Sequence, residues 1–442
     1  MKDNSYMTEG NITKALWRFT LPMIMGGILQ QLYSLTDAFI LGNFVGDTAV
    51  ASVSASSAVL NICFFAIVGL MTGFSIQLSH MFGAKEYDKI KKLVTTAMTF
   101  MGIGAVIASF LIVTIKYFIF DLINTPAEII PGASSYLNFA APGIVFSGMY
   151  NLYGGMLRAV GDSKRPLIAL IISSAINVAL DLLFVAVFKM GVGGAALATV
   201  IAQTISAVYL IYHANKNEFF RISFKKSFYD MGIFKETVSL SLPKMLQTCL
   251  NSVGQMMLQS INNYFGVFAV AAISTAYRID SLTITPIMYL NSAISIFTGQ
   301  NLGAQKPERA RKGLFTGSVM AGVFSLAVTF IFVFLGGWLL SLFGLSQQSI
   351  DIGWRFFRLC AIFYPCFAVY NVFIGYLQGK KDVKFVSFLS ILCLAIRVGG
   401  SFILRDILGV DVVAIAECIS WAAGLIIVIW RYRWHRKKEK QV

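Results

Sequence analysis

The sequence predicts an all-α polytopic membrane protein, with twelve transmembrane helices arranged as two six-helix lobes. Composition is the first reason: of 442 residues, 57% are hydrophobic and 13% charged, and the mean hydropathy is +0.72. Soluble domains carry about 25% charged residues. The other two reasons are twelve apolar segments long enough to cross about 30 Å of hydrocarbon, and a resemblance between the first six segments and the last six.

The apolar segments are separated by short polar or charged stretches. Several exceed the roughly 20 residues that a helix needs to span a bilayer, so we expect some of them to tilt or to project into solvent. In residue numbers they are 16–41, 50–80, 91–117, 131–157, 166–188, 193–214, 236–262, 268–297, 312–338, 352–378, 384–404 and 411–432.

Charge alternates between successive connections. Basic residues concentrate in every second connection and at both chain ends, as represented by Lys89, Lys164, Arg221, Arg309 and Lys381. The positive-inside rule therefore predicts a multi-pass protein of the inner (plasma) membrane with both termini cytoplasmic. The polar N-terminus lacks a signal-peptide pattern, so we expect the first span to remain in the mature protein. The net charge of +15 reflects this topology and lipid contact, and no nucleic-acid partner is expected.

The two halves repeat at an offset near 220 residues. Thr20-Leu21-Pro22 returns as Ser241-Leu242-Pro243, Gly83-Ala84-Lys85 as Gly303-Ala304-Gln305, and Tyr150-Asn151 as Tyr370-Asn371. Because each half has an even number of spans, the lobes should be related by a pseudo-two-fold axis along the membrane normal. We expect an N-lobe at 1–214, a cytoplasmic linker at 215–235 and a C-lobe at 236–442. The linker alternates aromatic and basic residues, which fits either an interfacial segment or a solvated loop.

Catalytic and metal-binding patterns are missing from the sequence. All six cysteines lie in apolar runs without a CxxC pair, and the three histidines lie near span ends. HExxH, GxSxG and GxxxxGK[ST] do not occur, so we expect no enzyme, no metal and no cofactor beyond a coupling ion. A channel remains an alternative, although an internal repeat with acids in one half favours alternating access.

Two acids lie inside the N-terminal spans, Asp37 in the first and Asp181 in the fifth. Asn177 precedes Asp181 by four residues, so both side chains share one face of a helix. A carboxylate at membrane depth is costly unless a cation, a proton or a hydrogen-bonding partner compensates it. The pair therefore predicts a cation or proton site, with a structural aspartate that tethers a neighbouring helix as the alternative.

Polar residues on the first, fourth and sixth spans could complete this site. Each of them alone is a weak signal, because a polar side chain in a span often bonds to another helix. The candidates are Gln30, Gln31, Tyr33, Thr36, Tyr136, Asn151, Thr199 and Gln203. In the C-terminal half, Lys244 and Arg278 are expected to pair locally, to extend to the interface or to bind backbone carbonyls rather than substrate.

Taken in order, several motifs resemble those of the multidrug and toxic compound extrusion (MATE) antiporters. They begin with Leu21-Pro22, Gln30-Gln31-Leu32-Tyr33 and Thr36-Asp37, and continue with Leu157 to Asp162, Asn177 to Asp181, Arg278 and Gly299 to Ala304. The resemblance extends from about Ile12 to Tyr432. It implies two lobes that export small organic cations or amphipathic drugs in exchange for H⁺ or Na⁺, working as a monomer in the lipid bilayer.

The resemblance also implies roles for individual residues. The branch with an N-lobe cation site matches here at Asp37, Tyr136, Asn151, Asn177, Asp181 and Thr199. Gln30, Gln31 and Tyr33 are then candidates for contacting substrate. Pro22 matches a proline that the family associates with bending of the first helix, and a proline does remove one helical hydrogen bond.

The C-lobe departs from the sodium-coupled branch of the family. Asn251 and Phe367 stand near positions where that branch has acids, so the C-lobe lacks the second acid pair. The alternative function is a lipid-linked saccharide flippase of the same superfamily, which would need a cationic cavity. Arg278 and Arg397 favour that alternative, whereas the acidic N-lobe and the twelve spans argue against it.

Overall fold

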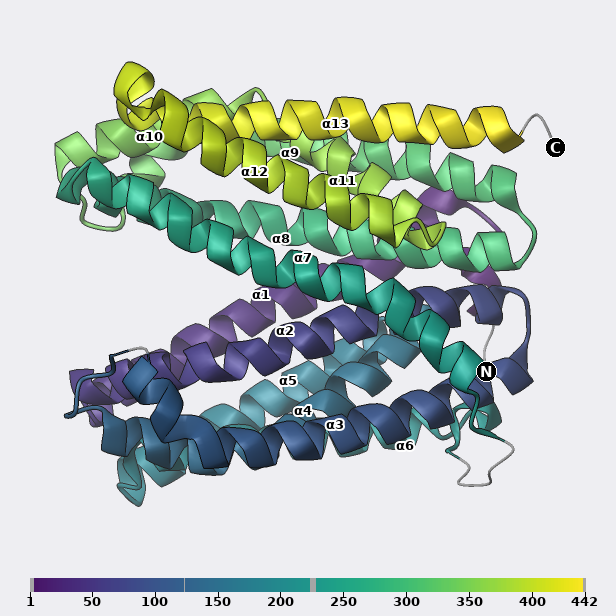
Figure 1. The fold of residues 1–442 in the computed structure, drawn as a ribbon, viewed down its shortest axis with the longest axis horizontal. Coiled ribbons are helices and arrows are strands. Elements are labelled where there is room, and N and C mark those ends of the chain that lie inside the picture. The colour runs from purple at the N-terminus through teal and green to yellow at the C-terminus, as the bar shows by residue number, and fades with distance from the viewer. Residues whose placement is uncertain (1–3, 123, 223–227, 440–442) are drawn as a thin grey trace. The chain divides into compact units, whose positions relative to one another are not determined.

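The computed structural model describes residues 4–122, 124–222 and 228–439, and within these ranges every regular element is a helix (Figure 1). Each predicted apolar segment coincides with a helix, except that 352–378 forms a bent pair. The long helices are α1 (Ile12–Phe44), α2 (Asp47–Gly83), α3 (Tyr87–Leu122), α4 (Ile130–Ala159), α5 (Lys164–Asp181), α6 (Gly191–Ala214), α7 (Met231–Tyr264), α8 (Val267–Gly303), α9 (Pro307–Ser341), α10 (Gln347–Ala361), α11 (Tyr364–Gly379), α12 (Val383–Leu408) and α13 (Val412–Glu439).

Six helical stretches within the described residues are long and apolar enough to cross a membrane by themselves. One of the six, Val383–Glu439, contains both α12 and α13. The pair α10 and α11 bends by 55° and adds a seventh stretch if it is counted as one span.

The chain divides into two compact units whose boundaries fall inside helices. Unit 1 contains Leu21–Met245, and unit 2 contains Tyr6–Thr20 together with Leu246–Val442. The division differs from the predicted lobe boundaries because the first part of α1 belongs to unit 2 and the first part of α7 belongs to unit 1. Each boundary lies within three residues of a helix-interior proline, Pro22 or Pro243. Proline removes a backbone hydrogen bond at these points, although both helices continue through it.

The backbone repeats as the sequence does. Five pairs of residues with positive φ lie 220 residues apart: Gly46 and Gly266, Lys85 and Gln305, Asn124 and Gly344, Gly161 and Lys381, and Lys189 and Gly409. Left-handed backbone is uncommon for residues other than glycine, so its recurrence at one offset is a specific signal. The internal repeat predicted from the sequence is therefore confirmed in the positions of the turns.

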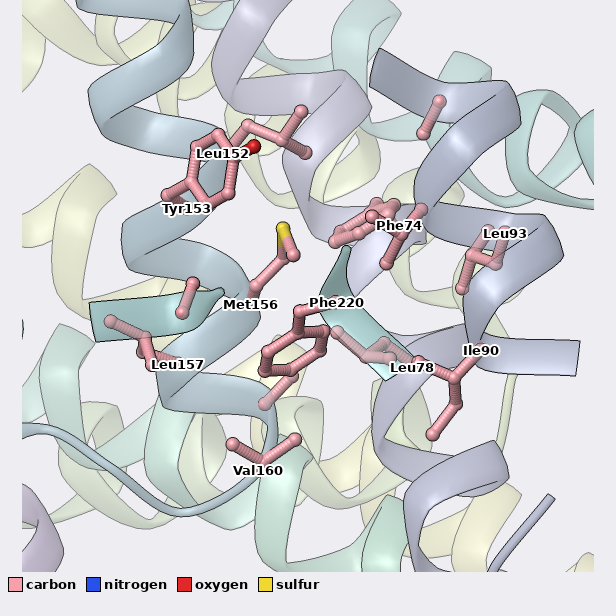
Figure 2. Packing of buried hydrophobic residues seen from close by; sticks show 14 of the residues in the cluster. Phe74, Leu78, Ile90, Leu93, Leu152, Tyr153, Met156, Leu157, Val160 and Phe220 are labelled. Carbon is pink, nitrogen blue, oxygen red and sulfur yellow. The ribbon is translucent and has the colours of Figure 1, made fainter. Parts of the chain in front are cut away.

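Unit 1 has its largest apolar core where α2, α3, α4 and α6 meet (Figure 2). Phe74 and Leu78 from α2 pack with Leu93 from α3 and Met156 from α4, and each is at most 1% exposed. Phe220, from the segment after α6, inserts its ring into this core and is fully buried. The predicted linker is thus partly a packed element of unit 1, while Phe224, Lys225 and Lys226 lie outside the described residues.

The first part of α7 packs closely against α2. A Cβ added to Gly73 would lie 2.7 Å from the carbonyl oxygen of Thr237, and one added to Gly69 would lie 2.9 Å from the Cα of Met245. Small residues four apart let two helix backbones approach in this way. Ser241 donates a hydrogen bond to the carbonyl of Leu70 at 3.0 Å, which fixes the register of the two helices.

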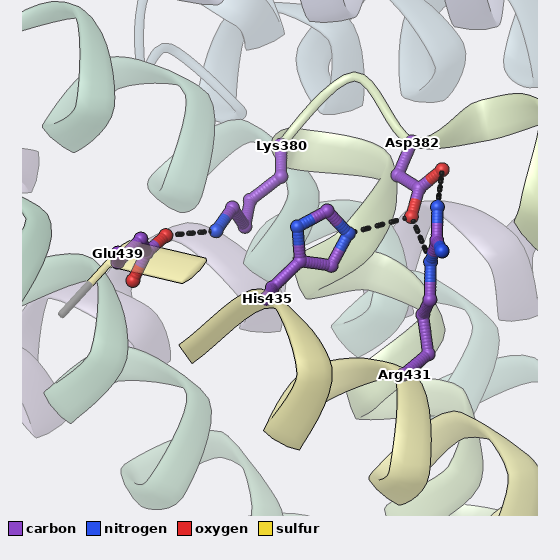
Figure 3. Close-up of polar contacts among 5 residues, drawn as sticks. All are labelled: Lys380, Asp382, Arg431, His435 and Glu439. Atoms are coloured by element: carbon purple, nitrogen blue, oxygen red, sulfur yellow. Dashed lines mark hydrogen bonds and ion pairs between the residues drawn. The ribbon is translucent and has the colours of Figure 1, made fainter. Parts of the chain in front are cut away.

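In unit 2, α12 and α13 run side by side, and a polar cluster joins the end of α13 to the turn before α12 (Figure 3). Arg431 Nε and His435 Nε2 each lie 2.8 Å from Oδ2 of Asp382. Burial alone would raise the pKa of Asp382, but hydrogen bonds from Arg431 and His435 outweigh burial and hold that pKa below its ordinary value. Lys380 pairs with Glu439 in the same cluster.

Candidate functional site

Helix α5 ends on the acid that the sequence singled out. Asn177 and Asp181 lie one turn apart on its buried face and are 0% and 1% exposed. Directly after Asp181 the chain changes to a π-helical turn, Leu182–Val187, and the Phe188 N–H donates to the carbonyl of Leu183 at 2.9 Å. π-Turns are rare and occur mostly at functional sites, because they shift the direction of the side chains around them.

The carboxyl groups of Asp37 on α1 and Asp181 on α5 lie within hydrogen-bonding reach of each other. Two ionised carboxylates cannot form such a bond, because each offers only acceptors. Among the described residues, no donor reaches Asp37 Oδ1 or either carboxylate oxygen of Asp181. The amide oxygen of Asn177 is also buried and receives no hydrogen bond from a described donor. The site therefore presents buried acceptor oxygens that no described donor serves.

Thr199 on α6 connects the helices around the acids. Its Oγ1 accepts hydrogen bonds from the hydroxyl of Tyr33 on α1 and from Nδ2 of Asn177 on α5, each at 3.3 Å. These bonds orient the Asn177 amide so that its oxygen, rather than its nitrogen, is left without a partner. Three helices that are distant in sequence thus hold one polar cluster.

The other predicted residues are placed differently. Tyr136 on α4 lies near enough to both acids to interact with them electrostatically. Asn151 donates its amide hydrogen to the carbonyl of Ser147 in its own helix at 2.8 Å. Gln30 and Gln31 are exposed on α1, and no described contact links them to the acids. The structure therefore brings together Tyr33, Asp37, Tyr136, Asn177, Asp181 and Thr199, and leaves Gln30, Gln31 and Asn151 apart from this cluster.

Charges buried in unit 2 have partners. Arg397 Nη2 lies 3.0 Å from Glu417 Oε2 and donates to the Tyr277 hydroxyl at 2.9 Å. The Tyr364 hydroxyl donates to Asp280 at 2.7 Å. Phe367, near the position where the sodium-coupled branch is expected to have an acid, packs against Trp421 with ring centroids 4.8 Å apart and ring planes tilted by 40°.

The sequence reading missed two parts of this geometry. The π-turn after Asp181 has no sequence signature within the apolar run Leu182–Val187. The ion pair between Arg397 and Glu417 joins two helices. The only signal for it in the sequence is that both charged residues lie inside predicted spans.

Comparisons with known proteins agree with this architecture. The MatE family model matches residues 22–183 and 243–403. The probable multidrug resistance protein YpnP of Bacillus subtilis is 29% identical over 378 residues, which cover 84% of this chain and 83% of the relative. The multidrug export protein MepA of Staphylococcus aureus is 24% identical over 97% of this chain and 96% of its own length.

Two solved structures share the fold. A transporter of the MOP superfamily from Pyrococcus furiosus superposes with a TM-score of 0.91 at 23% identity, over 100% of this chain and 99% of that one; its binding pocket is described as reversed in polarity, suggesting a different function. An outward-facing multidrug resistance transporter of the MATE family superposes with a TM-score of 0.89 at 23% identity, over 98% of both chains.

Proposed function

Because the chain belongs to the MatE family, we propose that it is a secondary active multidrug efflux antiporter. Its substrates are small cationic or amphipathic organic compounds, and its coupling ion is H⁺, with Na⁺ as the other candidate. The relatives named multidrug resistance and multidrug export proteins support the class of substrate. Transport proceeds by alternating access between two conformations with different affinities for ion and substrate.

The observation that carries the proposal is the group of unsatisfied acceptors in unit 1. Asp37 and Asp181 lie within hydrogen-bonding reach of each other, and no described donor serves three of their four oxygens. A buried carboxylate without a compensating partner has a high free-energy cost. A proton or another cation is therefore expected to occupy this site during the transport cycle. A structural aspartate that tethers a neighbouring helix would instead be expected to accept a hydrogen bond from that helix.

Each companion residue has a physical role in this scheme. Thr199 and Tyr33 hold Asn177 so that its amide oxygen remains an acceptor near the acids. Tyr136 lies near enough to both carboxyls to interact with them electrostatically. Pro22 lies near the boundary between the two units on α1 and is the natural place for that helix to bend.

Proton and substrate compete in this mechanism. A proton on the pair removes the negative charge that an organic cation would otherwise neutralise, so binding of one weakens binding of the other. Uptake of protons from the outer side then releases the drug there, and loss of protons to the cytoplasm prepares the site for the next drug. The competition requires only that each ligand binds the two conformations differently.

For the membrane arrangement, we infer twelve spans with both termini cytoplasmic, two lobes related by a pseudo-two-fold axis along the membrane normal, and a monomer in the inner membrane. The alternation of basic connections and the repeat support this topology.

The test is dye export from proteoliposomes under separately imposed gradients. We expect export driven by a pH gradient, and weaker binding of a cationic dye as the pH falls, in the wild type but not in Asp181→Asn or Asp37→Asn protein. Dye binding that does not change with pH but changes with Na⁺ concentration would identify Na⁺, and not H⁺, as the coupling ion. If no ion gradient can drive the dye against the concentration gradient of the dye, antiport is excluded.

The flippase alternative needs a cationic cavity for a pyrophosphate. Arg397, which favoured that alternative in the sequence, lies against Glu417 and Tyr277. Its charge is thereby largely balanced, so the observation that supported the alternative is weakened.

A further inference from the structure

Unit 1 contains an apolar groove that the acid site does not use. It has a volume of about 280 Å³ and lies among α2, α3 and α4, with Phe234 of α7 as one wall. The ring of Phe234 stacks on Phe100 of α3, with centroids 4.3 Å apart. An apolar cavity of about 150 Å³ accommodates a benzene molecule, so this volume suits a longer hydrocarbon chain.

Glycines create the groove. Gly102 and Gly104 of α3 and Gly148 of α4 all line it, and a Cβ built on any of the three would meet no atom within 4 Å. Only 6% of the residues in the most apolar stretch of α3 are buried inside the protein. Val106 and Phe110 of this helix are 56% and 69% exposed. In the proposed topology these side chains face the bilayer, so the groove lies on a helix that is in contact with lipid.

Basic residues lie near one end of the groove in the sequences of α3 and α7, and Lys91 Nζ lies 4.6 Å from the ring centroid of Phe228, just before α7. Lys91 precedes the lining residue Met98 by seven residues, about 10 Å along the same face of α3. Lys92 adjoins it, and Lys235 follows Phe234 on α7. Within the described part of the chain, no carboxylate forms an ion pair with any of these three lysines. The acids nearest in the α7 sequence have other partners: Asp230 accepts the backbone N–H groups of Gly232 and Ile233, and Glu236 accepts from Gln77.

We propose that this groove binds one acyl chain of an anionic phospholipid, with the lipid headgroup held by Lys91, Lys92 and Lys235. Hydrocarbon fits the apolar lining, and a phosphate-bearing headgroup complements the lysines at the level where the proposed topology places the cytoplasmic leaflet. Between apolar surfaces in a bilayer, packing and charge rather than the hydrophobic effect decide occupancy, so the lysines provide the preference for anionic lipid. The inference depends on the proposed topology but not on the proposed ion coupling.

Occupancy has a consequence for α7. Phe234 belongs to the first part of α7, the part that packs on α2 through Gly69 and Gly73. An acyl chain would contact α3, α4 and Phe234 together, and would therefore hold the first part of α7 against α3 and α4. Bound anionic lipid would slow the opening of this contact.

The experiment counts lipid on the purified full-length protein by native mass spectrometry, with phosphatidylglycerol and phosphatidylcholine as probes. Gly148→Leu and Gly104→Leu each fill the groove. Gly322→Leu on α9 is the matched control, because a Cβ there also meets no atom within 4 Å and the residue does not line the groove. The Lys91→Gln/Lys92→Gln double variant tests the headgroup contacts.

We expect the wild type and Gly322→Leu to retain one more phosphatidylglycerol than either groove-filling variant. We expect the lysine variant to lose at least a threefold preference for phosphatidylglycerol over phosphatidylcholine. A phosphatidylglycerol carrying a photoreactive acyl chain should label peptides from 98–108 and 144–152 of the wild type. Equal lipid counts in all variants, or labelling confined to other helices, would overturn the site.

Hydrogen exchange tests the consequence for α7. Amides of 231–245 should exchange more slowly with phosphatidylglycerol than with phosphatidylcholine, and this difference should vanish in Gly148→Leu protein. Unchanged exchange would refute the link to α7. These measurements involve no ion gradient, so a protein that binds the lipid but cannot export a dye would refute the proposed antiport and leave this site standing.

Discussion

Replacing Asp181 with asparagine tests whether this acid couples transport to an ion or has a structural role. The carboxyls of Asp181 and Asp37 lie within hydrogen-bonding reach, and neither Asp181 oxygen has a described donor. Asparagine supplies an N–H donor to Asp37 and removes one negative charge. A hydrogen bond to a charged group contributes about 1.5–3 kcal/mol, so the variant should be more stable than the wild type where the acids are ionised.

The sign of this effect depends on pH. At pH 8.5, we expect Asp181→Asn to unfold at higher temperature than the wild type, by about 2–4 °C for each kcal/mol gained in a unit of this size. At low pH the wild-type pair carries its own proton and forms the same hydrogen bond, so the difference should disappear. If Asp181 instead tethered a neighbouring helix, the variant would be less stable at every pH.

The assay is thermal unfolding in detergent from pH 5 to pH 8.5, together with dye export under a pH gradient. Asn177→Asp is the matched opposite change: it adds a carboxylate one turn from Asp181 and should be destabilising at high pH but not at low pH. An Asp181→Asn protein that is destabilised throughout, or one that still exports dye under a pH gradient, would refute the reasoning.

Three further predictions concern topology, unit 2 and the end of α13. With an impermeant thiol reagent on intact cells in a cysteine-free background, Lys189→Cys should be labelled and Lys164→Cys only after permeabilisation; the reverse pattern would invert the topology. Asp280→Asn retains an acceptor for the Tyr364 hydroxyl, so its export per folded transporter should exceed that of Asp181→Asn, and a folded Asp280→Asn protein without coupling would move the ion site to unit 2. Asp382→Asn should cost about 1–3 kcal/mol at neutral pH. Because its partners hold the pKa of Asp382 below the ordinary value, that cost should shrink as the pH falls below about 4, and a cost that does not change with pH would show that the charge is irrelevant.

The helices were predictable from the sequence because the bilayer fixes their length and composition. The offset of 220 residues was visible in short motifs, and it reappears in the turns at Gly46 and Gly266. The unit boundaries were not predictable. They depend on the close approach of α2 and α7 at Gly69 and Gly73, and a pair of small residues in an apolar run does not say which helix it will meet.

The site was only partly predictable from spacing. Tyr33 and Asp37 are one turn apart on α1, and both reach the cluster, whereas Gln30 lies two turns from Asp37, about 10 Å along the helix. Thr199 could be proposed as a polar residue of the sixth span, but its role in linking Tyr33 to Asn177 depends on three helices packing together. Periodicity describes one helix at a time, so contacts between helices could not be predicted from the sequence.

The two units share a backbone pattern and differ in whether their buried charged residues have partners of opposite charge. The offset that relates Asp162 to Asp382 places Arg397 where unit 1 has Asn177. Arg397 has a carboxylate partner, Glu417, at 3.0 Å, whereas the acids beside Asn177 have no cationic partner among the described residues. A proton that enters unit 1 therefore changes the net charge of an uncompensated site, whereas a proton that binds Glu417 in unit 2 would have to disrupt its ion pair with Arg397. Disrupting a buried pair costs about 3–5 kcal/mol, so the acids of unit 1 are a more favourable place for the proposed ion to bind and leave than the Arg397–Glu417 pair.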